Sequence, residues 1–320
     1  MHAVFDERRY LIPFRAALLP QIFIDTLVIG AGVGGMRAAM SASAHGEVIV
    51  VAKGKLPQCN SAWAQGGIAA VLDEQDTFDS HIEDTLGAGG DLCDLPAVRT
   101  VIENGPARIR ELIDWGLPFD KVDGSDELAL GREGGHTRHR IVHADGDATG
   151  RAVMATLEKQ VRANDNVRIF EECFVLDLIT LEGVPPRCVG AITHHPKYGL
   201  QVIWAEATIL ASGGCGKVFR ESTNAGVATG DGLAMAYRAG AQLADMAFMQ
   251  FHPTTLYVAG ASRSLVTEAV RGEGAYLIDR NGHRFMGDYH EMKELAPRDV
   301  VAHAIITQTA RTNFSHVYLD

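Results

Sequence analysis

The chain has 320 residues, 47% of them hydrophobic and 22% charged, which is enough for one large folded domain or two moderate ones. Its formal net charge is -11 and no lysine- and arginine-rich run occurs, so we expect no nucleic-acid partner, although a local basic pocket for an anionic ligand is possible. No apolar run approaches the roughly 20 residues that span a bilayer, so we also expect no membrane association.

Cysteine usage and the N-terminus predict a cytoplasmic protein. The five cysteines show no Cys-x-x-Cys spacing, which indicates buried reduced thiols and neither a zinc site nor a disulfide framework. Residues 1–24 carry acidic residues and prolines where a signal peptide has a basic end and an unbroken apolar core, which disfavours export. We interpret residues 1–24 as an N-terminal extension of unassigned role.

The first predicted elements form a βαβ unit. Apolar, β-rich runs at 24–29 and 48–52 predict two strands, and the alanine-rich segment 34–44 between them predicts a helix. Gly30, Gly32 and Gly35 place a G-x-G-x-x-G pattern between the first strand and this helix. Such glycines permit a tight turn, close approach of a pyrophosphate and close helix–strand packing. The pattern predicts a bound dinucleotide, with a purely structural turn as the alternative.

Helices and strands continue in blocks along the chain. Apolar residues at helical spacing predict helices within 95–115, where Pro106 is expected to separate two of them, and around Met154, Leu157 and Val161. Short β-rich runs and one more helix follow, at 166–170, 173–180, 188–195, 200–205, 207–214 and 231–240. This order predicts an α/β fold with an inserted β-layer. From about residue 248 the chain becomes rich in glycine, histidine, arginine and proline, which predicts a second domain.

Other segments offer a close backbone approach to the same ligand. The stretch NSAWAQGG at 60–67 supplies small residues just past the second strand, and a double glycine ends the last β-rich run. Asp231 opens a helix, where it either caps the helix or meets a cofactor hydroxyl. Lys53 stands where an acidic residue usually holds an adenine ribose, which disfavours NAD and leaves FAD open. The predicted cofactor residues are Gly30, Ala31, Gly32, Val33, Gly34, Gly35, Lys53, Asn60, Ser61, Ala64, Gln65, Gly66, Gly67, Val175, Gly213, Gly214 and Asp231.

The stretch GREGGHTRHRIVHADGDATG at 131–150 concentrates histidines, arginines and glycines. His136, His139 and His143 have the spacing of metal ligands on a helix. Gly134 and Gly135 argue against that helix, because each glycine costs about 1 kcal/mol relative to alanine. No cysteine or carboxylate set completes a metal shell, so we predict no metal site.

The order of motifs resembles a known family. GAGVGG, AQGGIAAV, REGGH, SGGCGKVF, TGDG, QFHPT, TEAVRGEGAYL and ELAPRDVV resemble the L-aspartate oxidases, flavoproteins of the succinate dehydrogenase and fumarate reductase superfamily, over residues 25–320. The resemblance implies a Rossmann-like FAD-binding domain at 25–247 and an incomplete α+β capping domain at 248–320. It also implies non-covalent FAD, since Asn60 stands where superfamily members with covalent FAD have a histidine.

The resemblance also implies the substrate residues. The motifs place catalytic roles on His252 and Arg298, and substrate binding on Glu133, Gln250, Thr267 and Glu268. A fixed cation and hydrogen-bond donors suit a dicarboxylate in a water-poor cleft. The alternatives are a structural role for His252 and pairing of Arg298 with Asp299 or Glu294.

Glu133 in the 131–150 stretch is expected near the substrate. Its carboxylate would attract the ammonium by which aspartate differs from succinate. The cationic residues of the stretch are expected to bring positive charge to the pocket of a doubly negative substrate and to the flavin phosphate. These residues are His136, Arg138, His139, Arg140 and His143.

The implied reaction is transfer of the Cα hydride of L-aspartate to FAD, giving iminoaspartate, with reoxidation by O2 to hydrogen peroxide or by fumarate. In the family this step begins the quinolinate branch of NAD biosynthesis, with quinolinate synthase downstream. One alternative is a succinate dehydrogenase or fumarate reductase flavoprotein subunit. Another is an inactive flavin-binding fragment, because the chain stops at HVYLD inside the expected capping domain. For that reason we expect low or absent activity from the 320 residues alone.

Overall fold

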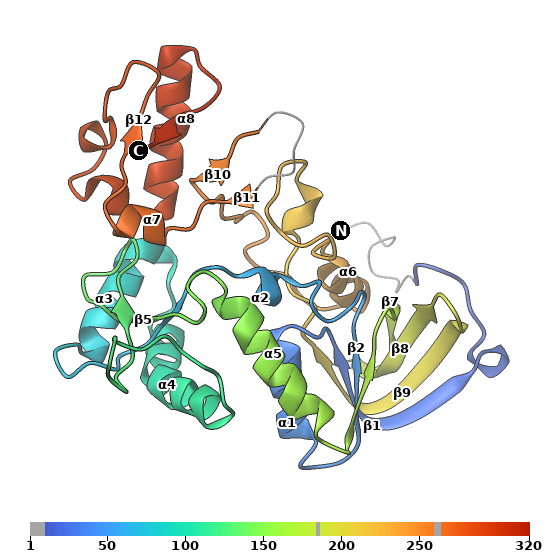
Figure 1. The fold of residues 1–320 in the computed structure, drawn as a ribbon. Helices are drawn as coiled ribbons and strands as arrows, with labels where there is room; N and C mark the ends of the chain where they lie inside the picture. The colour runs from blue at the N-terminus through green and yellow to red at the C-terminus, as the bar shows by residue number, and fades with distance from the viewer. Residues whose placement is uncertain (1–9, 184–185, 259–263) are drawn as a thin grey trace. The chain divides into compact units, whose positions relative to one another are not determined.

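The computed structural model of the chain describes residues 10–183, 186–258 and 264–320 (Figure 1). The chain forms two compact units, which we call the first unit (Met1–Trp63 and Val153–Phe248) and the second unit (Ala64–Ala152 and Met249–Asp320). The predicted change near residue 248 coincides with a unit boundary. The segment 64–152, which we expected inside the domain at 25–247, instead groups with residues 249–320 in the second unit, where for example the Gly135 N–H donates to the Leu295 carbonyl oxygen at 3.2 Å.

The first unit is built on a six-stranded sheet with the order β6-β2-β1-β9-β8-β7. The parallel strands are β1 (Gln21–Ile29), β2 (Val48–Val51), β6 (Val167–Phe170) and β9 (Gly199–Leu210). From β9 the sheet continues antiparallel through β8 (Arg187–His195) and β7 (Phe174–Leu181). The predicted α/β class is confirmed, and the inserted β-rich runs extend the main sheet. The runs at 200–205 and 207–214 are one strand, β9, up to Leu210.

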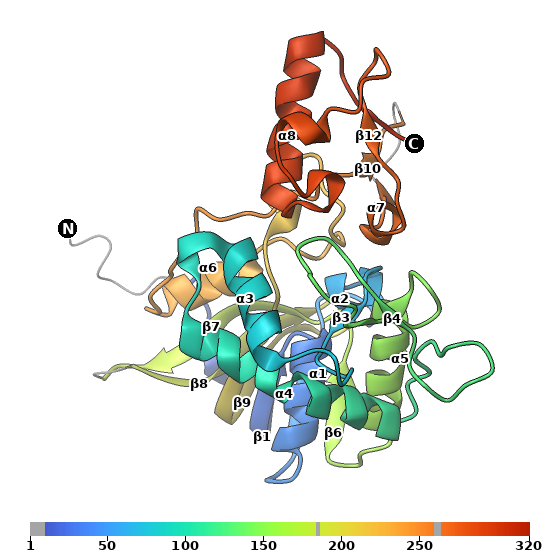
Figure 2. The same ribbon diagram turned by 90° about the vertical axis from the view of Figure 1, so that its left-hand side faces the viewer.

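Helices of the first unit bury apolar faces as the spacing predicts. α1 (Val33–Ala42) contacts β1 and β2, and α6 (Asp231–Arg238) contacts β7 (Figure 2). α5 (Thr149–Arg162) starts in the second unit and continues into the first. Its predicted apolar positions Met154, Leu157 and Val161 are all buried. The sheet core combines strand residues with a helix residue, among them Leu27, Ile49, Ile203 and Met235.

The described part of the predicted N-terminal extension belongs to the fold. β1 begins at Gln21, and its first four residues pair with residues 202–205 of β9. Upstream, Tyr10 and Phe14 pack against a core cluster on the sheet. Residues 1–9 lie outside the described residues. The expectation of a separate extension over 1–24 is therefore corrected for 10–24, because the apolar residues there find partners on β8 and β9.

The second unit combines helices with short strands. Its helices are α3 (Phe78–Gly89), α4 (Leu95–Asp114), α7 (Ala269–Gly272) and α8 (Arg298–Thr312). In a three-stranded sheet, β5 (Ile141–Val142) lies between β3 (Ile68–Ala69) and β4 (Leu130–Gly131). The described residues also form two sheets of two strands each. One pairs β10 (Thr255–Leu256) with β11 (Ser264–Leu265), and the other pairs β12 (Leu277–Ile278) with β13 (Tyr318–Leu319). α2 (Asn60–Trp63) ends the N-terminal part of the first unit. Short 3-10 helices lie at Ala16–Leu18, Gly90–Leu92, Gly216–Val218, Met286–Asp288 and Lys293–Leu295.

Two helices of the second unit differ from the expectation. α4 continues through Pro106, so the prediction of two helices is wrong. A proline inside a helix loses one backbone hydrogen bond. Pro106 itself is buried on the same face as Ile102 and Ile109, and this packing keeps the helix whole. Within 248–320 the sequence patterns also did not predict α8, whose buried face is built from Val301, Ala304 and Gln308.

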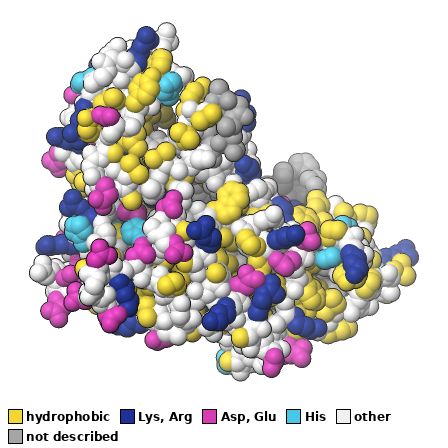
Figure 3. All heavy atoms as spheres, viewed as in Figure 1, with side chains coloured by type: hydrophobic (Ala, Val, Ile, Leu, Met, Phe, Trp, Pro, Cys, Tyr) yellow, Lys and Arg dark blue, Asp and Glu magenta, His cyan; other side chains and the backbone are white. Residues whose placement is uncertain are grey.

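The surface carries charges of both signs. On the face seen in Figure 3, lysine and arginine side chains are interspersed with aspartate and glutamate. Within residues 10–183, 186–258 and 264–320, we find no helix with the length and apolar character needed to cross a membrane. The five cysteines are free thiols, and Cys173 is buried.

Gly35 and Gly34 give a matched pair of substitutions in α1. A Cβ on Gly35 would lie 1.8 Å from the carbonyl oxygen of Gly30, whereas a Cβ on Gly34 would meet nothing within 4 Å. We expect Gly35→Ala to lower the free energy of unfolding by about 2 kcal/mol or more, because overpacking displaces the helix from β1. Gly34→Ala should be neutral or stabilising by up to about 1 kcal/mol. Urea unfolding of both variants tests this, and equal effects would contradict it.

Candidate functional site

A cavity of about 360 Å³ lies within the first unit, at the carboxyl ends of β1, β2 and β9. Ligands of open α/β sheets bind in this position. The turns at 29–34, 51–56 and 211–214 form much of its wall. Predicted cofactor residues that line it are Gly30, Ala31, Gly32, Val33, Gly34, Lys53, Asn60, Ser61, Val175, Gly213, Gly214 and Asp231.

The N-terminus of α1 forms one side of this cavity. Gly32 caps the helix without a side-chain hydrogen bond, and the Val33 N–H donates to Ser61 Oγ at 3.2 Å. A Cβ on Gly32 would lie 3.1 Å from the same Ser61 oxygen, so a larger residue would crowd the turn. A helix N-terminus with exposed N–H groups favours an anion such as a pyrophosphate.

Lys53 and Asp231 form an ion pair in the cavity wall. Lys53 Nζ lies 2.6 Å from Asp231 Oδ2, which also accepts a hydrogen bond from Thr229 Oγ1 at 2.7 Å. Burial alone raises the pKa of Asp231, but the hydrogen bonds from Lys53 and Thr229 outweigh it and leave the pKa below its ordinary value. The carboxylate is therefore ionised and has polar partners, in addition to its place at the start of α6.

Asn60 uses both ends of its amide inside the protein. Its Nδ2 donates to Asn224 Oδ1 at 2.7 Å, and its Oδ1 accepts from the Ala225 N–H at 2.8 Å. The residue thus fixes the segment 224–225 against α2. Its amide nitrogen is not a nucleophile.

The remaining predicted cofactor residues lie outside the cavity wall. Gly35 packs against the backbone of Gly30, a structural role. The segment 64–67, with Ala64, Gln65, Gly66 and Gly67, belongs to the second unit. There, Gln65 Oε1 is buried and has no hydrogen-bond partner in the described part of the chain. Buried acceptors are usually paired, so this oxygen suits a donor from a bound ligand.

Sequence reasoning missed several cavity residues. Cys173 and Phe174 line the cavity directly before Val175, and Met235 lies one helical turn after Asp231. Gln58 lines it from the loop that follows β2. The only available signal was their position next to residues already singled out, because their side chains carry no motif.

Arg298 is the centre of a polar cluster in the second unit. Its Nε donates to Glu268 Oε2 at 2.7 Å, and its Nη1 donates to Gln250 Oε1 at 2.9 Å. Glu268 is buried, and its other oxygen accepts from Arg271 Nη2 at 3.0 Å. The alternative pairing of Arg298 with Asp299 or Glu294 is not observed. Arg298 Nη2 has no hydrogen-bond partner among the described residues, and the side chain is 38% exposed, so it is available to a ligand.

His252 lies near this cluster with one ring nitrogen already engaged. Its Nδ1 lies 2.9 Å from the Thr254 carbonyl oxygen and 3.2 Å from the Thr254 backbone nitrogen. Burial and the positive charge of Arg298 lower the pKa of His252 below its ordinary value, so the ring is neutral at neutral pH. Thr267 is half-buried, and its hydroxyl accepts from the Ala269 N–H at 3.4 Å.

Glu133 is held inside the second unit by two donors. Its Oε1 lies 3.1 Å from His143 Nε2 and accepts from the Gly67 N–H at 3.3 Å. Burial raises the pKa of Glu133, but the hydrogen bonds from His143 and Gly67, with the charges of His143 and Arg298, leave it below its ordinary value. Next to it, a Cβ on Gly134 would lie 2.5 Å from Glu268 Oε1, so the loop at 131–135 packs directly on the Arg298 cluster.

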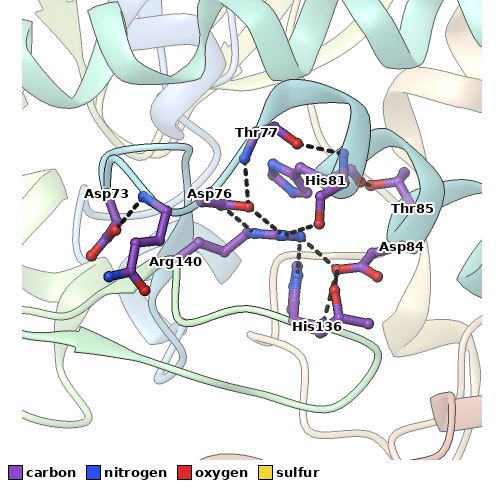
Figure 4. Close-up of polar contacts among 11 residues, drawn as sticks. Asp73, Asp76, Thr77, His81, Asp84, Thr85, His136 and Arg140 are labelled. Carbon is purple, nitrogen blue, oxygen red and sulfur yellow. Dashed lines mark hydrogen bonds and ion pairs between the residues drawn. The ribbon is translucent and has the colours of Figure 1, made fainter.

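Arg140 contradicts the expectation that it brings charge to a pocket. It is fully buried, donates to both oxygens of Asp76 at 2.8 Å, and donates to Asp84 at 2.6 Å (Figure 4). Two carboxylates therefore neutralise it, and it joins the 131–140 loop to α3. Of the other cationic residues, His136 lies 3.5 Å from an Arg140 nitrogen, and Arg138 and His139 are exposed.

The histidines of the 131–150 stretch do not lie on one helix. β4, a turn and β5 occupy the stretch up to residue 142, as the glycines predicted. Across residues 10–183, 186–258 and 264–320, no three His, Cys, Asp or Glu side chains are grouped to hold a metal ion. His136 instead contacts the ring of His81, with centroids 5.6 Å apart.

His81 gives a stability prediction. Burial, followed by the charges of Arg140 and His136, lowers its pKa from 6.5 to about 4, despite the opposing carboxylates of Asp76 and Asp84. The unfolded chain binds this proton near pH 6.5 and the folded chain only near pH 4, so the free energy of unfolding falls as the pH drops through this window. The wild-type protein should lose about 2 kcal/mol of unfolding free energy between pH 6.5 and 5 through His81, and we expect His81→Leu to abolish this part of the pH dependence. Urea unfolding at the two pH values tests this, and an unchanged pH dependence would contradict it.

Comparison with known proteins gives the family. The model of the FAD binding domain matches residues 25–320. The chain is 48% identical to L-aspartate oxidase 1 of Ralstonia nicotianae over 302 residues, 92% of this chain and 56% of that protein. It is 46% identical to L-aspartate oxidase of Streptomyces coelicolor over 309 residues, 93% of this chain and 52% of that protein. The chain thus spans about half the length of the curated relatives it matches.

Solved structures agree with this assignment. The quinol fumarate reductase FrdA of E. coli matches with a TM-score of 0.87 and 32% identity, over 94% of this chain and 54% of that chain. A flavocytochrome c3 fumarate reductase in its open conformation matches with a TM-score of 0.72 and 30% identity, over 91% of this chain and 52% of that chain. The matching family model gives FAD as the cofactor. The chain therefore belongs to the FAD-binding-domain family of flavoproteins and is similar to the L-aspartate oxidases.

Proposed function

We propose that the protein is an FAD-dependent L-aspartate oxidase that converts L-aspartate to iminoaspartate. The observation that carries this proposal is the pairing of opposite charges within the second unit. Arg298 offers a cation for a carboxylate, and the ionised Glu133 offers an anion for an ammonium. The two lie close to each other, since the charge of Arg298 acts on Glu133 and the neighbouring Gly134 packs against Glu268. An amino dicarboxylate is the small ligand that satisfies both groups.

The first-unit cavity fits FAD. Its apolar lining from the strand ends suits flat rings, the α1 N-terminus suits a pyrophosphate, and Lys53 with Asp231 suits the ribose hydroxyls. We propose non-covalent binding, because Asn60 has its amide engaged and offers no nucleophile. When bound, FAD supplies the acceptor for the Cα hydride and is reoxidised by O2 or fumarate.

Each residue of the second-unit cluster has its own proposed role in substrate binding. Arg298 holds a substrate carboxylate through its unpartnered Nη2, while Glu268 and Gln250 fix the plane of its guanidinium. Glu268 is therefore a positioning residue, since both of its oxygens are bound by arginines. His252 is fixed through Nδ1, which lies 2.9 Å from the Thr254 carbonyl oxygen, and we propose Nε2 as the ring nitrogen that contacts the ligand. Thr267 adds a hydroxyl donor to the same carboxylate.

A succinate dehydrogenase or fumarate reductase flavoprotein is the second candidate. The fold similarity to E. coli FrdA favours it, since that chain matches with a TM-score of 0.87. Against it, succinate and fumarate have no ammonium for Glu133, and an unpaired carboxylate beside a dianion is unfavourable. We therefore place L-aspartate first and propose succinate and fumarate as weaker ligands. We propose that the reaction takes place in the cytoplasm and that quinolinate synthase uses its product.

The test uses the purified protein loaded with FAD. After gel filtration, its flavin spectrum is recorded, and hydrogen peroxide is measured with L-aspartate and with succinate. We expect retained flavin and, at whatever low rate the 320 residues sustain, more peroxide from L-aspartate than from succinate. A preference for succinate would support the second candidate. A protein that retains no flavin would overturn both.

A further inference from the structure

The ring of His143 lies in a slot between glycines. A Cβ on Gly67 would lie 2.9 Å from His143 Nε2, and a Cβ on Gly131 would lie 3.1 Å from His143 Cε1. Gly131 belongs to β4, Gly67 directly precedes β3, and His143 directly follows β5, so the three-stranded sheet itself brings them together. The side chain is only 19% exposed. The ring therefore has little freedom to leave this position.

The partners of Glu133 are unequally divided between its two oxygens. Oε1 faces both His143 Nε2 and the Gly67 N–H. Oε2 accepts no hydrogen bond from any residue in the described part of the chain, although the Glu133 side chain is only 12% exposed. An ionised carboxylate has acceptor capacity on both oxygens, so Oε2 is left for a donor from outside the chain.

The charges around Glu133 come from several elements. His143 and the Gly67 N–H favour its ionised form, and so does Arg298 from α8. His136 of the same loop also lies nearby, since the charges of Glu133 and Glu268 both act on its pKa. Glu268, next to α7, packs against Gly134. Among these groups, His143 is the side chain that hydrogen-bonds the carboxylate directly. Burial is the largest single influence and raises the pKa of Glu133, so removing the His143 donor would weaken the interactions that oppose it.

We propose that His143 is a positioning residue that keeps Glu133 ionised and turned so that Oε2 receives the substrate ammonium, and thereby sets the preference for an amino dicarboxylate over a plain one. This inference rests on the proposed function. His143 does not touch the reacting atoms in this role. It acts through Glu133, whose Oε1 it occupies.

Two variants separate this role from a general structural one. His143→Gln keeps an N–H donor where Nε2 lies, and His143→Leu removes the donor with little loss of apolar volume. Isothermal titration calorimetry of each FAD-loaded protein gives the Kd of L-aspartate and of succinate at several pH values. Steady-state peroxide formation gives kcat and KM with L-aspartate.

The expected pattern is selective. His143→Leu should weaken L-aspartate binding about tenfold or more, since hydrogen bonds to charged groups are the strong ones, and leave the Kd of succinate within about twofold. The loss should grow as the pH falls, appear in KM more than in kcat, and be largely restored in His143→Gln. Equal weakening of both ligands, or a Gln variant as poor as the Leu variant, would overturn the inference.

Measurements on the wild-type protein distinguish a failure of the proposed function from a failure of the inference about His143. If it does not bind L-aspartate in preference to succinate, the proposed function fails and the inference falls with it. If it prefers L-aspartate and the variants keep that preference, the function stands and the role of His143 alone is refuted.

Discussion

Arg140→Met is expected to lower the free energy of unfolding by about 3–5 kcal/mol, the cost of breaking a buried ion pair by removing one partner. Arg140 is fully buried and donates hydrogen bonds to Asp76, Asp84 and Ser80. Methionine fills a similar volume but donates none of these bonds. Two carboxylates that are nearly inaccessible to water would then lose their counterion.

Urea unfolding at pH 7, followed by circular dichroism, measures the effect. Arg99→Met is the matched control, because Arg99 forms an exposed pair with Glu103 one helical turn away on α4. Exposed pairs of this kind contribute about 0.3–0.5 kcal/mol. A similar shift in both variants would show that the buried cluster does not stabilise the fold beyond an ordinary surface pair. A second variant, Asp76→Asn, should reproduce much of the loss, since it unbalances the same cluster.

The cavity of the first unit could be predicted well from sequence because its determinants are local. Parallel strands end at the same edge of a sheet, so the turns after β1, β2 and β9 meet wherever the strands pair. A G-x-G-x-x-G pattern therefore indicates both the turn and its neighbours. Gly35 has the close helix–strand packing that the pattern predicts, through its contact with Gly30, but it does not line the cavity.

The role of Arg140 could not be predicted, because burial of an arginine depends on partners distant in sequence. Asp76 and Asp84 lie more than 50 residues before it, and nothing in their spacing marks them as its partners. Its place in a basic-looking stretch suggested a ligand pocket. Pro106 was misjudged for a related reason, since the packing of α4 outweighs the cost that a proline has in an isolated helix.

The Arg298 cluster of the second unit lies between these cases. The motifs identified Arg298, Glu268 and Gln250 as one group, and the structure places them in hydrogen-bond contact. The motifs did not show that Glu268 has both oxygens bound by arginines, which makes it unsuited to contact a dianion directly. They also gave no hint that His143 holds Glu133, because that contact depends on the pairing of β4 and β5.

Arg298→Met is expected to reduce kcat/KM for L-aspartate by about 10²-fold or more, the size of the loss when one charge-stabilising donor is removed from an active site. Within the described residues, Arg298 has an Nη2 without a hydrogen-bond partner beside two nitrogens fixed by Glu268 and Gln250. Without its charge, a dianionic ligand would face the buried carboxylate of Glu268. Steady-state peroxide formation by the FAD-loaded protein measures the change.

Arg298→Lys separates charge from geometry. Lysine keeps the charge but cannot contact Glu268, Gln250 and a ligand carboxylate through one planar group, so it should recover only part of the loss. Arg108→Met on α4 is the control, because Arg108 is 56% exposed and forms a surface pair with Glu111 on the same helix. Full activity in Arg298→Met would remove this arginine from substrate binding. Glu268 would then have no substrate-binding arginine to position, so the assignment of the Arg298 cluster to substrate binding would also fail.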